Sequence, residues 1–226
     1  MTVRKALREN SLSGVFGVLL LAALVGQALT GLASYNATVA VDDLPPLTLG
    51  EYVTSSQFAV DVAENWQSEY LQFLLYIVLT VWLVQRGSPE SKKVDEQGGE
   101  DDKKQKLGRH VDPKSPRWAR AGGWRTTLYS NSLGIIMGVF FLGSWTAQLV
   151  AGTSAYNSDR LQNLQAPLSI WQYGGSADFW NRTFQNWQSE FLAVGSMVVL
   201  SIYLRQRGSP ESKPVGSPHT TTGVEG

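Results

Sequence analysis

Five consecutive residues that combine a carboxylate, two amides, a hydroxyl and an indole occur twice in the chain. Residues 65–69 and 186–190 share the sequence Asn-Trp-Gln-Ser-Glu, and each copy directly precedes an apolar run. A carboxylate within or beside an apolar helix costs free energy to bury, so such groups often bind a solute, a lipid headgroup or a proton. Glu69 and Glu190 are therefore the residues that most strongly suggest chemistry.

Two glutamines are expected at the same depth as these glutamates. At about 1.5 Å per helical residue, Glu69 lies roughly 26 Å from Arg86. Gln27 lies roughly 28 Å from the basic residues that precede its own apolar run. The same spacing places Gln148 beside Glu190, and residues four apart on one helix face add the asparagines. The sequence thus predicts an intramembrane polar cluster of Gln27, Asn65, Glu69, Gln148, Asn186 and Glu190.

Two interpretations of this cluster stay open. It could bind a ligand, or it could join helices, because Gln, Asn and Ser form hydrogen bonds between membrane helices. We favour the structural role, with Trp and Tyr gathering at the membrane–water interface. The expected interfacial aromatic residues are Trp66, Trp187, Tyr35 and Tyr156. If Glu69 and Glu190 face each other, their repulsion would raise one pKa and leave a shared proton.

The composition excludes most kinds of catalytic centre. With no Cys, the chain has no disulfide, thiolate nucleophile or Cys-ligated metal. His110 and His219 lie in polar segments, and no phosphate-binding or zinc-protease motif occurs. Equal numbers of basic and acidic residues, 19 of each, argue against nucleic-acid binding. We therefore expect no enzyme, no cofactor, no metal site and no nucleic-acid partner.

Apolar runs indicate that the chain crosses a membrane. Residues 12–33 form an uncharged run long enough for a bilayer core, which needs about 20 helical residues, and residues 133–150 resemble it. Residues 70–84 and 191–204 are shorter, but each continues a polar stretch compatible with a helix. The first run follows basic residues, as a secretory signal would, but its internal equivalent indicates a retained span. We therefore expect an all-α membrane protein with four transmembrane helices.

The chain contains one unit twice. At an offset of 121, residues 10–92 align without a gap on 131–213, and 17 of the 28 positions from 65 to 92 are identical. Each unit holds two expected spans, so both insert in the same sense, as two tandem, parallel-oriented helical hairpins in a four-helix bundle. The expected divisions are a cytoplasmic N-terminus (1–10), a first repeat (11–86), a disordered cytoplasmic linker (87–124), a second repeat (125–207) and a disordered cytoplasmic tail (208–226).

Basic residues predict the orientation. With the N-terminus inside, every Lys and Arg except Arg160 and Arg182 faces the cytoplasm, where basic residues concentrate. Both termini are therefore expected in the cytoplasm. Segments 85–92 and 206–213 share Gln-Arg-Gly-Ser-Pro-Glu-Ser-Lys, which we call the paired motif, and its Gly and Pro are typical of a helix end. The expected cytoplasmic anchor and helix-stop residues are Arg86, Gly87, Arg207 and Gly208.

Small residues should shape the remaining helix ends and contacts. Ser55 and Ser176 are the expected N-caps of the second and fourth long helices. Glycines in the first and third, including Gly31 and Gly152, permit close approach of another element.

These sequence features resemble an uncharacterised bacterial membrane family, a domain of unknown function. The resemblance covers residues 10–92 and 131–213. It implies a multi-pass protein of the bacterial cytoplasmic membrane and supplies no activity. The expected function is non-catalytic, through assembly with itself, with lipid or with another envelope protein. The alternative is a permeation path for a proton or small solute through the paired Gln and Glu residues.

Overall fold

Every described element of secondary structure is helical. The computed structural model describes residues 5, 8–41 and 43–223, and these ranges contain eight α-helices, one short 3-10 helix and no strand. The first half contains α2 (Ser11–Val41), α3 (Leu49–Val53) and α4 (Ser56–Trp82). Between α4 and the second long apolar helix lie η1 (Gly108–His110), α5 (Arg117–Ala121) and α6 (Gly123–Ser130). The second half contains α7 (Ser132–Gln162), α8 (Ile170–Gly174) and α9 (Ala177–Tyr203). The all-α class is therefore confirmed.

The helices of the two halves match in length and in their caps. α2 and α7 each have 31 residues, α3 and α8 have 5, and α4 and α9 have 27. The Ser55 hydroxyl accepts a hydrogen bond from the backbone N–H of Phe58 (3.2 Å), and Ser176 accepts one from Phe179 (3.3 Å). Each serine satisfies an N–H that the first helical turn leaves unpaired, which confirms both predicted N-caps.

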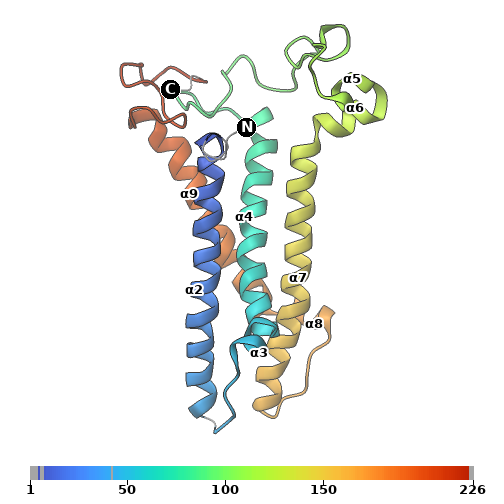
Figure 1. Cartoon of the computed structure of the whole chain (residues 1–226), viewed down its shortest axis with the longest axis vertical. Helices are drawn as coiled ribbons and strands as arrows, with labels where there is room; N and C mark the ends of the chain where they lie inside the picture. The colour runs from blue at the N-terminus through green and yellow to red at the C-terminus, as the bar shows by residue number, and fades with distance from the viewer. Residues whose placement is uncertain (1–4, 6–7, 42, 224–226) are drawn as a thin grey trace.

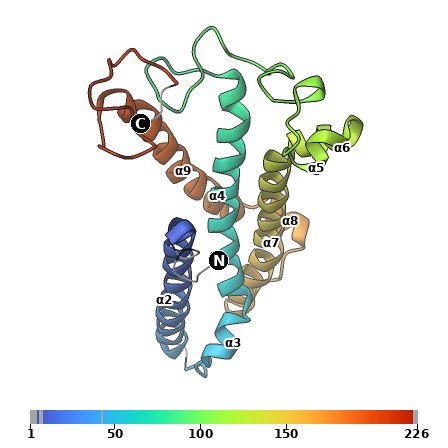
Figure 2. The same cartoon turned by 45° about the horizontal axis from the view of Figure 1, so that its top comes forward.

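α4 and α7 lie side by side in Figures 1 and 2, whereas α2 stands apart from them in Figure 2 and α9 leans away from α4. α4 packs along α7 and more sparsely against α9, whereas α2 contacts chiefly α3. α2 and α7 both begin at the end of the molecule that carries the linker, which we call the linker end (Figure 1). α4 returns the chain to that end, and α9 diverges from α4 toward it (Figure 2).

Two described helices, not four, are long and apolar enough to cross a membrane. They are α2, with a mean hydropathy of 2.1 over its most apolar stretch, and α7, with 1.7. The expectation of four transmembrane helices is therefore wrong. α4 and α9 carry charged and amide side chains in their first halves, and they end at Trp82 and Tyr203, before their apolar runs end. The apolar helical part of α4, residues 70–82, is about 20 Å long, which is shorter than a bilayer core of about 30 Å.

A short helix lies between the two long members of each expected hairpin. α3 contacts both α2 and α4, and α8 contacts both α7 and α9. Because α2 packs chiefly on α3, the structure does not support a four-helix bundle. The predicted disorder of the linker and tail, the domain boundaries and the orientation in a membrane stay predictions.

An asparagine fixes the turn that follows each apolar helix. The Asn36 amide donates to the carbonyl of Leu47 (2.9 Å) and accepts from its N–H (2.8 Å). Asn157 makes the same two bonds to Leu168, at 2.8 and 2.7 Å. Each side chain satisfies both backbone groups of one loop residue, so Leu47 and Leu168 are held in the same way.

A tyrosine on each short helix fills a notch made by glycine. Tyr52 lies against Gly31 of α2, and Tyr173 lies against Gly152 of α7. Both rings are buried, with 3% and 1% of their surface exposed. A Cβ at position 152 would lie 2.6 Å from the Tyr173 hydroxyl, so only glycine fits this notch without a shift. The glycines therefore let the short helices press against the apolar ones.

Candidate functional site

Buried polar side chains join α4 to α9 at the residues of the repeated Asn-Trp-Gln-Ser-Glu sequence. Gln67 is fully buried, and its carbonyl accepts a hydrogen bond from the indole N–H of Trp187 (2.8 Å). The Ser68 hydroxyl, 1% exposed, donates to the carbonyl of Asn65 at 2.9 Å, and its oxygen lies 3.5 Å from the carboxylate of Glu190. Polar groups removed from water need partners of this kind, so the contact favours one register between the two helices.

A second buried polar pair joins α7 to α9. Gln148 and Thr183 are both fully buried, and the Gln148 amide nitrogen lies 3.4 Å from the Thr183 hydroxyl oxygen. Among the described residues, the Gln148 carbonyl and the indole N–H of Trp145 have no hydrogen-bond partner. These groups lie three residues apart on α7 and so share a face. One is an acceptor and the other a donor. We define the buried polar layer as Gln67, Ser68, Gln148, Thr183, Trp187 and Glu190.

The structure brings only part of the predicted cluster together. Glu190 reaches α4, but Gln148 pairs with Thr183 and not with Glu190. Glu69 is exposed. Gln27 is half-buried on α2, which stands apart from the layer.

The two asparagines of the predicted cluster bond to their own helices. Asn65 donates to the carbonyl of Asp61 (2.7 Å), and Asn186 donates to that of Arg182 (2.9 Å). Both bonds run back by four residues along the helix. These side chains therefore satisfy local carbonyls and do not link one helix to another.

The four aromatic residues expected at an interface have different surroundings. Tyr35 packs on Tyr52 with ring centroids 6.0 Å apart, and Tyr156 packs on Tyr173 at 5.4 Å. Trp187 is half-buried within a group of rings on α7 and α9. That group comprises Phe141, Trp145, Phe179, Trp180, Phe184, Trp187 and Phe191. Trp66 is 42% exposed.

An ionic cluster at the start of α4 and α9 was not predicted from the sequence. The Arg182 guanidinium lies 3.2 Å from Glu64, 3.8 Å from Asp61 and 3.5 Å from Asp178. The Tyr173 hydroxyl donates to Asp178 at 3.0 Å. One cation therefore faces three carboxylates, beside a small cavity of about 90 Å³ that Asp159 also lines.

Burial shifts the pKa values of this cluster, which lies outside both apolar helices that could cross a membrane. Loss of solvent raises the pKa of Asp61 and of Glu64, and the nearby Arg182 opposes that rise. Burial also raises the pKa of the Tyr173 hydroxyl, and the negative charge of Asp178 raises this pKa further. The hydroxyl therefore keeps its proton and stays a hydrogen-bond donor. Among the described residues, no group of three or more His, Asp or Glu is arranged to hold a metal ion.

A signal for this cluster is present in the sequence. Asp61 and Arg182 are counterparts at the offset of 121, yet they carry opposite charges. A search for identical positions passes over such a pair, whereas a search for complementary differences would find it. The cluster therefore rests on a change between the two halves.

The paired motifs form two similar loops beyond the long helices. The Ser91 hydroxyl accepts from the N–H of Gln85 (2.8 Å), and Ser212 accepts from Gln206 (2.9 Å). Each bond closes a loop around a left-handed glycine, since Gly87 has φ 89° and Gly208 has φ 81°. These backbone angles favour glycine.

The predicted helix stop lies beyond the actual helix ends. Leu83 and Leu204, the C-cap residues, are already extended. Arg86 and Arg207 therefore follow α4 and α9 and do not mark their last turns. The hydrogen bonds to Ser91 and Ser212 hold the chain in its loop, so each helix ends earlier than the apolar pattern suggests.

Fold and site together define an all-α protein with two apolar helices suited to a membrane and a polar layer packed between α4, α7 and α9. The chain belongs to a family defined by a domain of unknown function, DUF6766, whose model matches residues 3–224. No curated protein and no solved structure matches the chain.

Proposed function

We propose that the chain is a multi-pass integral protein of the bacterial cytoplasmic membrane. We further propose that it acts without catalysis, by assembling with itself, with lipid or with another envelope protein. The observation that carries this proposal is the exposure of α2 and α7. In the most apolar stretch of each helix, only 6% of the residues are buried.

The exposure distinguishes these helices from those of a water-soluble core. A core helix of comparable hydropathy is mostly buried, whereas α2 has apolar side chains exposed on all sides, including Leu12, Val18 and Leu21. α7 is internal, so a cleaved secretory signal does not account for it. Apolar surface on this scale in water would promote association, and lipid removes that cost.

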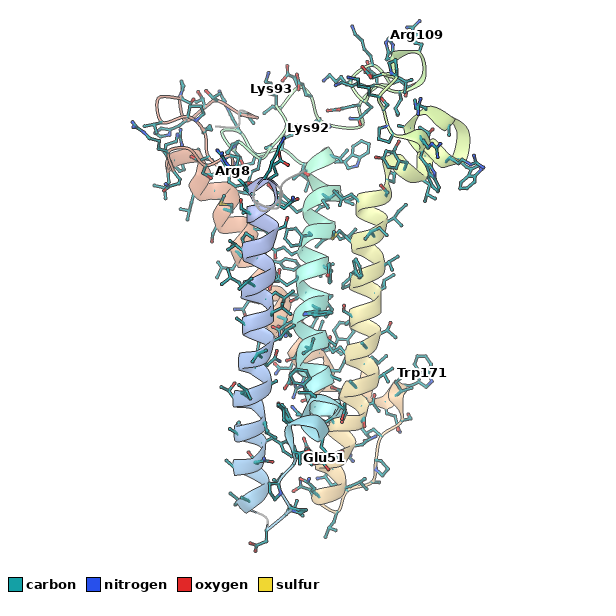
Figure 3. All side chains as sticks on the ribbon, in the orientation of Figure 1. Arg8, Glu51, Lys92, Lys93, Arg109 and Trp171 are labelled. Atoms are coloured by element: carbon teal, nitrogen blue, oxygen red, sulfur yellow. The ribbon has the colours of Figure 1, made fainter. Side chains whose placement is uncertain are left out.

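The charge distribution supports a cytoplasmic linker end. Arg8, Lys92, Lys93 and Arg109 lie at that end in Figure 3, whereas Glu51 lies toward the other. Basic residues concentrate on the cytoplasmic side of membrane proteins. We therefore propose that α2 and α7 both enter from the cytoplasm, with both termini on that side.

We also propose that the two halves are copies of one unit. Equal helix lengths, the Asn36 and Asn157 bonds and the two tyrosine–glycine notches support this proposal. The copies then differ where they meet, at Asp61 and Arg182.

Membrane extraction tests the location. In cells expressing the full chain, we expect the protein in the membrane pellet after washing with carbonate at pH 11, and in solution after nonionic detergent. Recovery of the intact chain in the soluble fraction without detergent would overturn the proposal. A soluble protein expressed in the same cells serves as the control for membrane breakage.

A permeation path for a proton or small solute is the second proposal, favoured by one observation. Among the described residues, Gln148 of the buried polar layer has an acceptor without a partner and the adjacent Trp145 has a donor without one, as a site for a passing polar species would. Purified protein in liposomes should then pass protons or solute, and Gln148→Leu or Glu190→Gln should stop the flux. Gln27→Leu, which changes the counterpart outside the layer, is the matched control. Absence of flux, or flux unchanged in both variants, would refute the path.

A further inference from the structure

Two adjoining cavities open between α4 and α9 toward the linker end, where these helices diverge (Figure 2). Their volumes are about 590 and 340 Å³, and both fall in the range of about 300–1,000 Å³ that is typical of small-molecule sites. Four residues line both of them and mark where they meet: Gln72, Tyr76, Glu90 and Val194.

The smaller cavity lies between equivalent positions of the two halves. Its eight lining residues form four pairs, each separated by the offset of 121. The pairs are Gln72 with Ala193, Phe73 with Val194, Tyr76 with Met197, and Glu90 with Glu211. Both copies of the paired motif therefore direct their glutamate to one space.

No cation of the described chain neutralises these two glutamates. Neither Glu90 nor Glu211 forms a salt bridge within the described residues, and the Tyr76 hydroxyl donates to Glu90. The motif lysines bind other groups. Lys92 pairs with Glu100 at 3.3 Å, and Lys213 donates to four backbone carbonyls, the nearest at 2.6 Å.

The larger cavity is apolar over most of its lining. Leu75, Leu79 and Leu83 line it on the α4 side, and Val194 and Val198 line it on the α9 side. The carboxylate of Glu90 lies at the boundary between the two cavities. Hydrocarbon surface and excess negative charge are therefore adjacent where the two cavities meet.

We propose that these joined cavities bind an amphipathic organic cation, with its hydrocarbon body between α4 and α9 and its ammonium head between Glu90 and Glu211. An ammonium group supplies the positive charge that the two carboxylates lack, and charge-assisted hydrogen bonds are stronger than neutral ones. The hydrocarbon body fills the apolar cavity and removes its lining from solvent. This binding site is separate from the buried polar layer and goes beyond the proposed function.

Native mass spectrometry of the full-length protein in nonionic detergent tests the proposal. The probes are dodecyltrimethylammonium, dodecanol and dodecyl sulfate at equal concentration below micelle formation. We expect one bound dodecyltrimethylammonium and at least about tenfold weaker binding of the other two, since interactions with a charged group contribute about 1.5–3 kcal/mol. Equal retention of dodecanol would overturn the proposal.

Variants separate the charged end from the apolar one. Glu90→Gln/Glu211→Gln should lower the affinity for the cation about tenfold. Asp95→Asn/Glu96→Gln, which removes two negative charges from the linker, should not. Gly195→Phe, which adds a ring to the larger cavity, should weaken binding of the cation without changing the glutamates. If the double variant fails to fold, Glu211→Gln alone tests the site. The Glu211 side chain is exposed, so this substitution should leave folding intact. A preference for the cation that survives both glutamate substitutions would refute the site.

The assay uses isolated protein and no membrane. Absence of cation binding in this assay would therefore not contradict the proposed membrane location. Equally, a negative extraction test would not contradict the binding site, which the mass spectrometry tests separately.

Discussion

At the scale of single residues, differences between the halves carry as much information as identities do. The repeated Asn-Trp-Gln-Ser-Glu sequence draws attention first, yet its asparagines bond to their own helices and Glu69 is exposed. Arg182 stands where the first half has Asp61, and it faces three carboxylates. Because an ion pair needs unlike partners, an exact two-fold repeat could not supply this contact at equivalent positions.

Arg182→Gln should destabilise the protein. Without the guanidinium, three partly buried carboxylates repel one another, and we expect a loss of about 1–2 kcal/mol, between the values for exposed and buried pairs. Thermal unfolding in detergent, followed by tryptophan fluorescence, measures the change. The loss should shrink in a Glu64→Gln background, because less charge is then left unpaired. Arg207 forms no salt bridge within the described residues, so Arg207→Gln is the control. Equal stability of Arg182→Gln and wild type would contradict this role.

Glu51 should make the start of α3 sensitive to pH. Its carboxylate accepts hydrogen bonds from the backbone N–H and the hydroxyl of Thr48, both at 2.8 Å, and these bonds lower its pKa. The stability that they contribute is complete above the ordinary Glu value and is lost as the pH falls through the lowered one. The same capping box in α8 uses Gln172, which carries no charge.

Amide hydrogen exchange, corrected for intrinsic rates, measures this difference. Protection of α3 should fall on acidification to below pH 4, whereas protection of α8 should not. Glu51→Gln should remove the pH dependence of α3 and keep its capping box, because Gln172 forms the same capping box in α8. An equal response of α3 and α8 in the wild type would argue against the charged cap.

At the scale of helices, local chemistry could be predicted from the sequence and tertiary packing could not. Ser55 and Ser176 begin helices because their hydroxyls cap free N–H groups, a local effect that a short sequence specifies. The ends of α4 and α9 depend on loop serines six residues beyond Gln85 and Gln206, and an apolar pattern cannot show this. The error of four spans followed from extending those helices too far.

The predicted polar cluster forms only in part for the same reason, because tertiary packing decides which side chains meet. Helix rise placed Gln148 and Glu190 at one height, but height says nothing of which face each helix turns to its neighbour. Gln148 therefore meets Thr183, a residue that lies outside the repeated sequences. The repeated sequence does lie at the contact between α4 and α9, where Gln67 meets Trp187.

The glycine notch gives a prediction at this scale. Gly152→Ala places a methyl group 2.6 Å from the Tyr173 hydroxyl and should destabilise the protein by about 1–3 kcal/mol through overpacking. Gly143→Ala, on the same helix with nothing within 4 Å of its Cβ, should be neutral or slightly stabilising. Thermal unfolding of the two variants compares them directly. If both melt like the wild type, then the buried tyrosine does not hold α8 against α7.

At the scale of the whole molecule, one end is basic and two exposed apolar helices begin there. Zero net charge conceals this asymmetry, because an excess of acidic residues in the rest of the chain balances the excess of basic residues at the linker end. What orients a membrane protein is the placement of Lys and Arg near its spans and not its net charge. The placement of Lys and Arg therefore predicts a direction of insertion, which stays a prediction, whereas the predicted number of spans is wrong.

Cysteine labelling tests that direction, since the chain has no Cys of its own. Glu9→Cys lies before α2 and Gly50→Cys lies beyond it, and both positions are exposed. In spheroplasts of a bacterial host, a membrane-impermeant maleimide should label position 50 at once and position 9 only after lysis, because basic residues flank the start of α2. Labelling of position 9 alone in intact spheroplasts would reverse the orientation. Equal labelling of both positions would show that α2 does not cross the membrane.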